Sequence, residues 1–197
     1  MPARVRWRLA FALSIGSVTD AVFAHSEAAG SGLMAGLVHP VTGMDHLFAM
    51  LAVGILSVRL GGSNIWRIPA AFVLAMSVGA WIGFQGWWVP PYESGISWSV
   101  LLLGIAIAHD SARRMLGALF IFVALFGLCH GYAHGLELPA SVSVVSYVTG
   151  LLVATVFIHT VGIFIGELAS SSRLHTMVLR AAGAGMALMG AWLVFYR

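Results

Sequence analysis

The sequence is short of charge, and this excludes an ordinary water-soluble domain. Only 9% of its 197 residues are charged, whereas 60% are hydrophobic, and the mean hydropathy is +0.95. Soluble domains carry about a quarter charged residues. A chain this apolar is expected to fold in a lipid bilayer.

Three further absences narrow the function. One cysteine, Cys129, excludes a disulfide framework within the chain and a metal site built from several thiolates. The bases are all arginines, scattered singly or in pairs without a basic patch, so nucleic acid is not an expected partner. The sequence has no glycine-rich phosphate loop, so it is not expected to hydrolyse ATP. Against this background it has eight histidines.

The first 24 residues, MPARVRWRLAFALSIGSVTDAVFA, have the pattern of a cleavable signal peptide. Arginines precede an apolar run of ten residues, and Val22-Phe23-Ala24 is a small-x-Ala cleavage pattern. The run is too short to span a bilayer, although an uncleaved first helix is the alternative. We expect residues 1–24 to be removed and residues 25–197 to form one domain beginning at His25.

Six apolar segments separated by short polar breaks follow residue 30. They are long and continuously apolar, whereas the strands of a membrane barrel alternate over about ten residues. Because only helices and closed barrels satisfy backbone polar groups in lipid, we expect an all-α membrane protein with six transmembrane helices. The expected spans are 31–58, 68–88, 95–110, 114–136, 142–168 and 176–196.

The arginines orient these spans through the positive-inside rule. If the mature N-terminus is outside, six of the seven arginines after residue 24 fall on the cytoplasmic side, and only Arg197 falls outside. The sequence therefore predicts that both termini lie outside.

Glycines recur at four-residue spacing within several predicted spans. Small residues at this spacing let membrane helices approach closely, so we expect them to serve packing. They are Gly32 and Gly36, Gly79 and Gly83, Gly127, Gly131 and Gly135, and Gly162 and Gly166.

The first predicted span contains HPVTGMDHLFAMLAVG, residues 39–54, whose ionisable groups are costly in lipid. His39 and His46 are seven residues apart, which places them on nearly the same face of a helix. Pro40 removes a backbone donor, so we expect the helix to kink or break nearby. A broken helix at membrane depth is tolerated where it lines a cavity. With Asp45, the two imidazoles are candidate metal ligands around this bend.

The fourth predicted span contains FGLCHGYAHGLELP, residues 126–139. His130 and His134 are at i and i+4 and Glu137 follows at i+7, so the three share one helical stripe. His-x-x-x-His on a helix is a common arrangement for a divalent metal, because both imidazoles can point at one ion. Glu137, near the outer end, is suited to receiving an incoming cation.

Further donors are spread along the predicted depth of the bilayer. Glu93 precedes the third span on the outer side, and His159 lies in the inner half of the fifth. We expect His25, Glu93 and His159 to contribute to a pathway, with the main site between the first and fourth spans. Imidazole and carboxylate donors suit Ni²⁺, Co²⁺ and Zn²⁺, and donor type alone does not choose among them.

The two motifs together resemble those of the HupE/UreJ family of nickel permeases, which accompany hydrogenase or urease gene clusters. The resemblance implies uptake of Ni²⁺, with Co²⁺ as the alternative, from periplasm to cytoplasm across the bacterial inner membrane. It implies ligand roles for His39, Asp45, His46, His130, His134 and Glu137. Tyr132 stands where some members have a third histidine of the second motif. The matching positions are His39, Pro40, Gly43, Asp45, His46, Ala49, Met50, Ala52, Val53 and Gly54, then His130, Gly131, Ala133, His134, Gly135, Glu137 and Pro139.

We therefore expect a permease and not an enzyme. Its partners would be a divalent metal ion, as transported substrate and not as a bound cofactor, and the lipid bilayer; the sequence leaves a homo-oligomer open. An intramembrane zinc hydrolase is one alternative, with histidines and Asp45 holding Zn²⁺ beside an open position for water. A haem-binding electron carrier, with His39 and His130 as axial ligands, is another. Donors beyond a single site, especially His159, favour passage of an ion.

Overall fold

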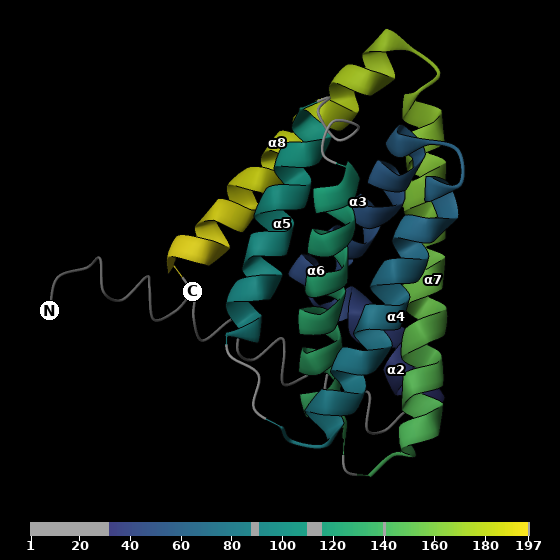
Figure 1. Ribbon diagram of the computed structural model, residues 1–197, viewed down its shortest axis with the longest axis vertical. Coiled ribbons are helices and arrows are strands. Elements are labelled where there is room, and N and C mark those ends of the chain that lie inside the picture. The colour runs from purple at the N-terminus through teal and green to yellow at the C-terminus, as the bar shows by residue number, and fades with distance from the viewer. Residues whose placement is uncertain (1–31, 88–90, 110–115, 140, 197) are drawn as a thin grey trace, which may run out of the picture.

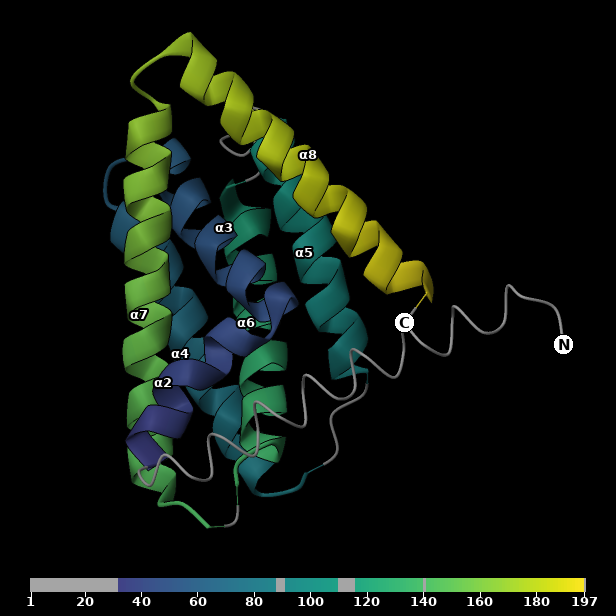
Figure 2. The same ribbon diagram turned by 180° about the vertical axis from the view of Figure 1, so that it is seen from behind.

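The computed structural model describes residues 32–87, 91–109, 116–139 and 141–196. All regular elements within these ranges are helices: α2 (Gly32–Thr42), α3 (Met44–Leu60), α4 (Asn64–Phe84), α5 (Tyr92–Ala108), α6 (Leu116–Leu136), α7 (Val144–Ala169) and α8 (Arg173–Tyr196). They form one bundle, in which α8 follows α5 and leans away from α7 (Figures 1 and 2). The predicted signal peptide and His25 lie outside the described residues.

The predicted spans all coincide with helices. By length and composition α4, α6, α7 and α8 can each cross a membrane, and the α2–α3 pair is a fifth candidate if it counts as one broken span. Helix α5 is apolar but has only 17 residues, about 25 Å at 1.5 Å per residue. The prediction of an all-helical, multi-pass membrane protein is confirmed.

The first predicted span is broken near Pro40, as predicted, and the break itself lies at Gly43. Helices α2 and α3 meet at 84°, and Gly43 between them is extended, with φ −95° and ψ 113°. Pro40 lies within the last turn of α2, where its missing N–H leaves one backbone carbonyl of the helix without its usual donor. As a result His39 and His46 lie on two different helices, and the prediction that they share one face of a continuous helix is wrong.

Glycines bring pairs of helices into backbone contact, as predicted. A Cβ atom at Gly131 of α6 would collide with the carbonyl oxygen of Met76 in α4, and one at Gly79 of α4 would collide with that of Leu128 in α6. A side chain at either position would therefore push the helices apart. Pairs α2–α7, α3–α7 and α5–α8 also approach through glycines. The α4–α6 contact fixes the helix that carries two of the predicted ligands.

Buried polar side chains in the bundle fall into two kinds. The hydroxyls of Ser57, Ser97, Ser99 and Thr155 each donate to a backbone carbonyl three or four residues earlier. Buried histidines, by contrast, have ring nitrogens with no hydrogen-bond partner among the described residues. Such unsatisfied atoms are rare in native proteins and require an explanation. They direct attention to the interior between α2, α3, α6 and α7.

Candidate metal site

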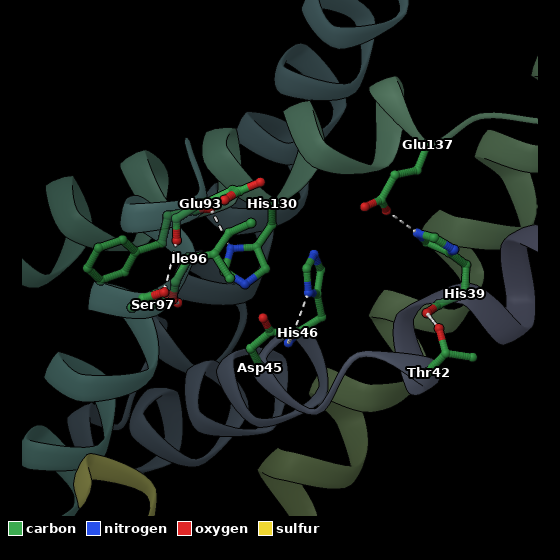
Figure 3. A network of polar contacts seen from close by, with 11 residues as sticks. His39, Thr42, Asp45, His46, Glu93, Ile96, Ser97, His130 and Glu137 are labelled. Atoms are coloured by element: carbon green, nitrogen blue, oxygen red, sulfur yellow. Dashed lines mark hydrogen bonds and ion pairs between the residues drawn. The ribbon is translucent and has the colours of Figure 1, made fainter. Parts of the chain in front are cut away.

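Helices α2, α3 and α6 bring four imidazoles together inside the bundle. The ring centroid of His134 lies 4.8 Å from that of His39 and 4.7 Å from that of His46. His46 in turn lies 4.8 Å from His130. Figure 3 shows His39, His46 and His130 with Glu137 near His39. We call these four histidines and Glu137 the histidine cluster.

One end of the cluster is a histidine–carboxylate pair that water can reach. Nε2 of His39 lies 2.9 Å from Oε2 of Glu137, and their side chains are 12% and 50% exposed. Donor atoms of His39, His134 and Glu137 lie within 4.8 Å of one another. Two ligands held at 2.0–2.2 Å by one metal ion are themselves about 3 Å apart. These three residues therefore need only a small contraction to coordinate a divalent cation.

The inner end of the cluster consists of His46 and His130, each with one ring nitrogen already held. Nδ1 of His130 donates to the carbonyl oxygen of Phe126 at 2.8 Å, which leaves the lone pair on Nε2. Nδ1 of His46 lies 2.9 Å from Oδ1 of Asp45, so the same tautomer follows. Both Nε2 atoms are buried without a hydrogen-bond partner in the described structure. Neutral imidazoles oriented in this way are ready to act as metal ligands.

Asp45 holds His46 in two ways. Its Oδ1 accepts hydrogen bonds from the backbone nitrogen and from Nδ1 of His46, both at 2.9 Å. A carboxylate on the far ring nitrogen is typical of a histidine that ligates a metal, since it fixes the tautomer and the orientation of the ring. In this conformation Asp45 positions a ligand, and its role as a direct ligand stays a prediction.

His159 is a buried histidine outside the cluster. The ring of Phe72 in α4 lies 5.6 Å from that of His130 and 5.2 Å from that of His159. His159 is 2% exposed, and neither of its ring nitrogens has a hydrogen-bond partner in the described structure. Helix α7 thus supplies a further buried donor, and the ring of Phe72 contacts both this histidine and His130.

Two residues at the site were missed by sequence reasoning. Tyr147 of α7 has a buried hydroxyl with no partner among the described residues, and its ring lies 5.8 Å from His39. Tyr147, Thr155 and His159 share the buried stripe of α7, and this polar periodicity could have revealed the tyrosine. Phe72 gave no such signal, because an aromatic residue in an apolar helix is ordinary.

The remaining predicted pathway residues are not brought into the cluster. Glu93 is exposed in the first turn of α5, where its carboxylate accepts a 3.4 Å hydrogen bond from Tyr92. His25 lies outside the described residues. Their part in a pathway stays a prediction.

Comparison of the sequence with known proteins identifies the family to which the chain belongs. A sequence profile described as "HupE / UreJ protein" matches residues 13–193, which include the whole cluster. The chain is also similar to "Protein HupE" of Rhizobium leguminosarum bv. viciae, with 37% identity over 183 residues that cover 93% of each chain. No solved structure matches.

Proposed function

Since the chain belongs to the HupE/UreJ family, we propose that it is a permease that moves Ni²⁺ inward across the bacterial inner membrane through the histidine cluster. The predicted family is confirmed, and it is not a family of enzymes, so the hydrolase alternative is dropped. Co²⁺ is the alternative cargo. In either case the ion is a substrate, not a resident cofactor.

Buried imidazoles without hydrogen-bond partners are the observation that supports this function most strongly. His130 and His134 are 0% and 1% exposed, and an unsatisfied buried nitrogen costs about 1–3 kcal/mol. A borderline divalent cation such as Ni²⁺ satisfies imidazole nitrogen well. Passage of such an ion gives a reason for keeping these costly groups in lipid.

Two carboxylates beside the histidines would balance the charge of a divalent cation. A divalent cation among four neutral imidazoles is countered at the cluster by Glu137, which is half-exposed at its mouth. Asp45, hydrogen-bonded to Nδ1 of His46, supplies a second carboxylate nearby, so the two carboxylates together would balance the two charges of the ion. Conduction requires binding that is strong enough to admit an ion and weak enough to release it.

The arrangement supports a stepwise route inward. Glu137 and His39 would receive the ion, and His134, which contacts both His39 and His46, would pass it to the inner pair. Movement onward to His159 would pass the Phe72 ring, because that ring contacts both His130 and His159. With the Phe72 ring in this position, the outer and inner donors would not form one continuous channel.

The distribution of arginines supports an outward-facing Glu137 and six spans. Helices α3, α4 and α8 carry arginines at one end of the bundle, and Glu137 follows the opposite end of α6 (Figure 1). The positive-inside rule then puts the arginine end in the cytoplasm and the start of α2 outside. With α2–α3 as one broken span and α5 as a short one, the chain crosses six times. The described arginines are Arg59, Arg67, Arg173 and Arg180.

Nickel uptake in cells lacking their own nickel importer tests the proposal. Cells expressing the chain should accumulate radioactive nickel, and His46→Ala and His130→Ala should abolish the gain at equal membrane levels of protein. No gain with the unmodified chain would remove the transport function. A gain that persists in both variants would leave transport standing and overturn the site.

A further inference from the structure

A second polar cavity lies away from the histidine cluster, at the arginine end of the bundle. Its volume is about 370 Å³, and it is lined by the ends of α3 and α7 and the first turns of α8. Two basic side chains, Arg59 and Arg180, line it together with Ser170 and Thr176. We call it the arginine cavity.

Both arginines are held at this cavity by the last carbonyl groups of α5. Nη1 of Arg59 donates to the carbonyl oxygen of Ile107 at 2.7 Å, and Nε of Arg180 donates to that of Ala108 at 2.8 Å. Positive side chains are favourable at a helix C-terminus, where carbonyl groups are left without partners. Two guanidinium groups from helices distant in the sequence are thereby brought to one cavity.

Arg180 has hydrogen-bond donors left over for a ligand. Its bond to α5 uses Nε and leaves its two terminal nitrogens without a partner among the described residues. It forms no ion pair with a carboxylate in the described part of the chain. Ser170 and Thr176 donate their hydroxyl protons to backbone carbonyls, so the arginines are the donors that the cavity offers. Paired guanidinium nitrogens match two phosphate oxygens well.

An apolar groove of about 480 Å³ continues from the arginine cavity. It lies between α8 and the helices α3, α5 and α7, and Leu179 lines both spaces. Phe48, Ile55 and Met186 are among its lining residues. The groove exists because α8 packs mainly on α5 and diverges from α7 (Figure 2).

The length of the groove matches one leaflet of a bilayer. Along α8 it extends from Leu179 to Met189, eleven residues whose ten steps rise about 15 Å along the helix. The hydrocarbon core of a bilayer is about 30 Å thick, so one leaflet is about 15 Å deep. A chain anchored at the arginine cavity would therefore end near the bilayer centre.

We propose that the arginine cavity and the apolar groove together bind one anionic phospholipid, with its phosphate on Arg180 and Arg59 and an acyl chain along α8. A free phosphate ion would use the cavity but leave the groove empty, and an apolar helix of a second copy would fill the groove but offer no anion to the terminal nitrogens of Arg180. An anionic lipid would supply both an anion for the arginine cavity and an apolar chain for the groove. With the orientation proposed above, the site faces the cytoplasmic leaflet, where basic pockets between helices bind anionic lipids.

Native mass spectrometry of the full-length protein in detergent tests the charged half of this site. With phosphatidylglycerol and phosphatidylcholine added in equal amounts, the unmodified protein should retain phosphatidylglycerol several-fold over phosphatidylcholine. Arg180→Ala should lose that preference, and Arg67→Ala, an arginine at the same end that does not line the cavity, should keep it. Equal retention of the two lipids by the unmodified protein, or an undiminished preference in Arg180→Ala, would overturn the proposal.

Filling the groove tests its apolar half without altering any charge. Gly185 lines the groove, and a Cβ atom there would meet nothing within 4 Å, so Gly185→Leu should fold and occupy the space of the acyl chain. Retention of phosphatidylglycerol should fall several-fold, whereas Gly117→Leu, which is equally open but remote, should have no effect. A phosphate-sized adduct in place of the lipid, or unchanged retention in Gly185→Leu, would contradict lipid binding. The measurement contains no nickel, so its outcome is independent of the transport proposal.

Discussion

At the residue scale, the cluster depends on which ring nitrogen of each histidine is already occupied. His130 and His46 give Nδ1 to a carbonyl and a carboxylate, and both keep a buried Nε2 for another partner. Because these acceptors set the tautomers, residues that never touch the metal can still decide how well it binds.

Asp45 provides the sharpest test of this positioning effect. We predict that Asp45→Ala weakens nickel binding about 10–100-fold, the usual cost of losing such a partner, measured by isothermal titration calorimetry on purified protein. Asp45→Asn should lose much less nickel affinity, because its amide oxygen can still accept the hydrogen bond from Nδ1 of His46. Equal losses in the two variants would show that the carboxylate charge itself is needed, as in a direct ligand.

Glu137 should act mainly on capture. It is the half-exposed carboxylate of the cluster, so Glu137→Gln keeps its size and removes the charge that attracts a cation. We expect nickel uptake with a KM raised several-fold and a maximal rate reduced less. Glu167→Gln, an exposed carboxylate near the other end of the bundle, is the matched control and should leave KM unchanged. A fall in maximal rate without a change in KM would place Glu137 after the capture step.

At the scale of helices, glycines decide how the ligand-bearing elements meet. The break at Gly43 sends α3 away from α2 at 84°, and close α4–α6 packing sets the position of His130 and His134. The apolar runs and polar breaks of the sequence were enough to predict where the helices lie. They placed the break near Pro40 but did not fix its residue, because Pro40 and Gly43 lie in the same stretch and either can interrupt a helix.

Gly43→Ala should leave the break intact but disturb the site. Its φ of −95° suits any residue, yet a Cβ atom would lie 3.0 Å from Oδ1 of Asp45 and 3.1 Å from Nδ1 of His46. We expect an unchanged melting temperature in detergent together with weaker nickel binding by calorimetry. Unaltered affinity would show that the Asp45–His46 pair can shift without consequence.

Gly131→Val tests the packing of α4 against α6. The added side chain would collide with the carbonyl oxygen of Met76, and overpacking of this kind costs about 1–3 kcal/mol. We expect a lower melting temperature and loss of nickel binding, since His130 is the adjacent residue. Gly117→Val lies where a Cβ atom would meet nothing within 4 Å. Its melting temperature should be closer to that of the unmodified protein. Equal melting of the two variants would argue against close α4–α6 packing.

At the scale of the whole molecule, the fold converts two sequence motifs into one site by crossing distant helices. The ligand types and the first and fourth spans could be predicted because ionisable residues are rare in apolar segments. Phe72 could not be placed there, since its role depends on which face of α4 turns inward. Which face turns inward depends on how the helices pack against one another, and this cannot be read from the sequence of one segment.

The proposed orientation predicts on which side of the membrane the C-terminus lies. If the chain crosses the membrane six times with an external N-terminus, as proposed, the C-terminus lies in the periplasm. Alkaline phosphatase fused after residue 197 should therefore be active, because it folds only after export, and a green fluorescent protein fused there should be dark. Bright fluorescence with inactive phosphatase would contradict the orientation and the cytoplasmic placement of the arginine end.

Nickel entry into liposomes that contain only the purified protein tests the central claim most directly. With a nickel-sensitive dye inside, vesicles carrying the unmodified chain should fill faster than protein-free vesicles. Vesicles with His130→Ala should fill at the protein-free rate, although the variant is incorporated equally well. Filling by the unmodified chain no faster than in protein-free vesicles, or equal filling by His130→Ala and the unmodified chain, would contradict transport through the histidine cluster.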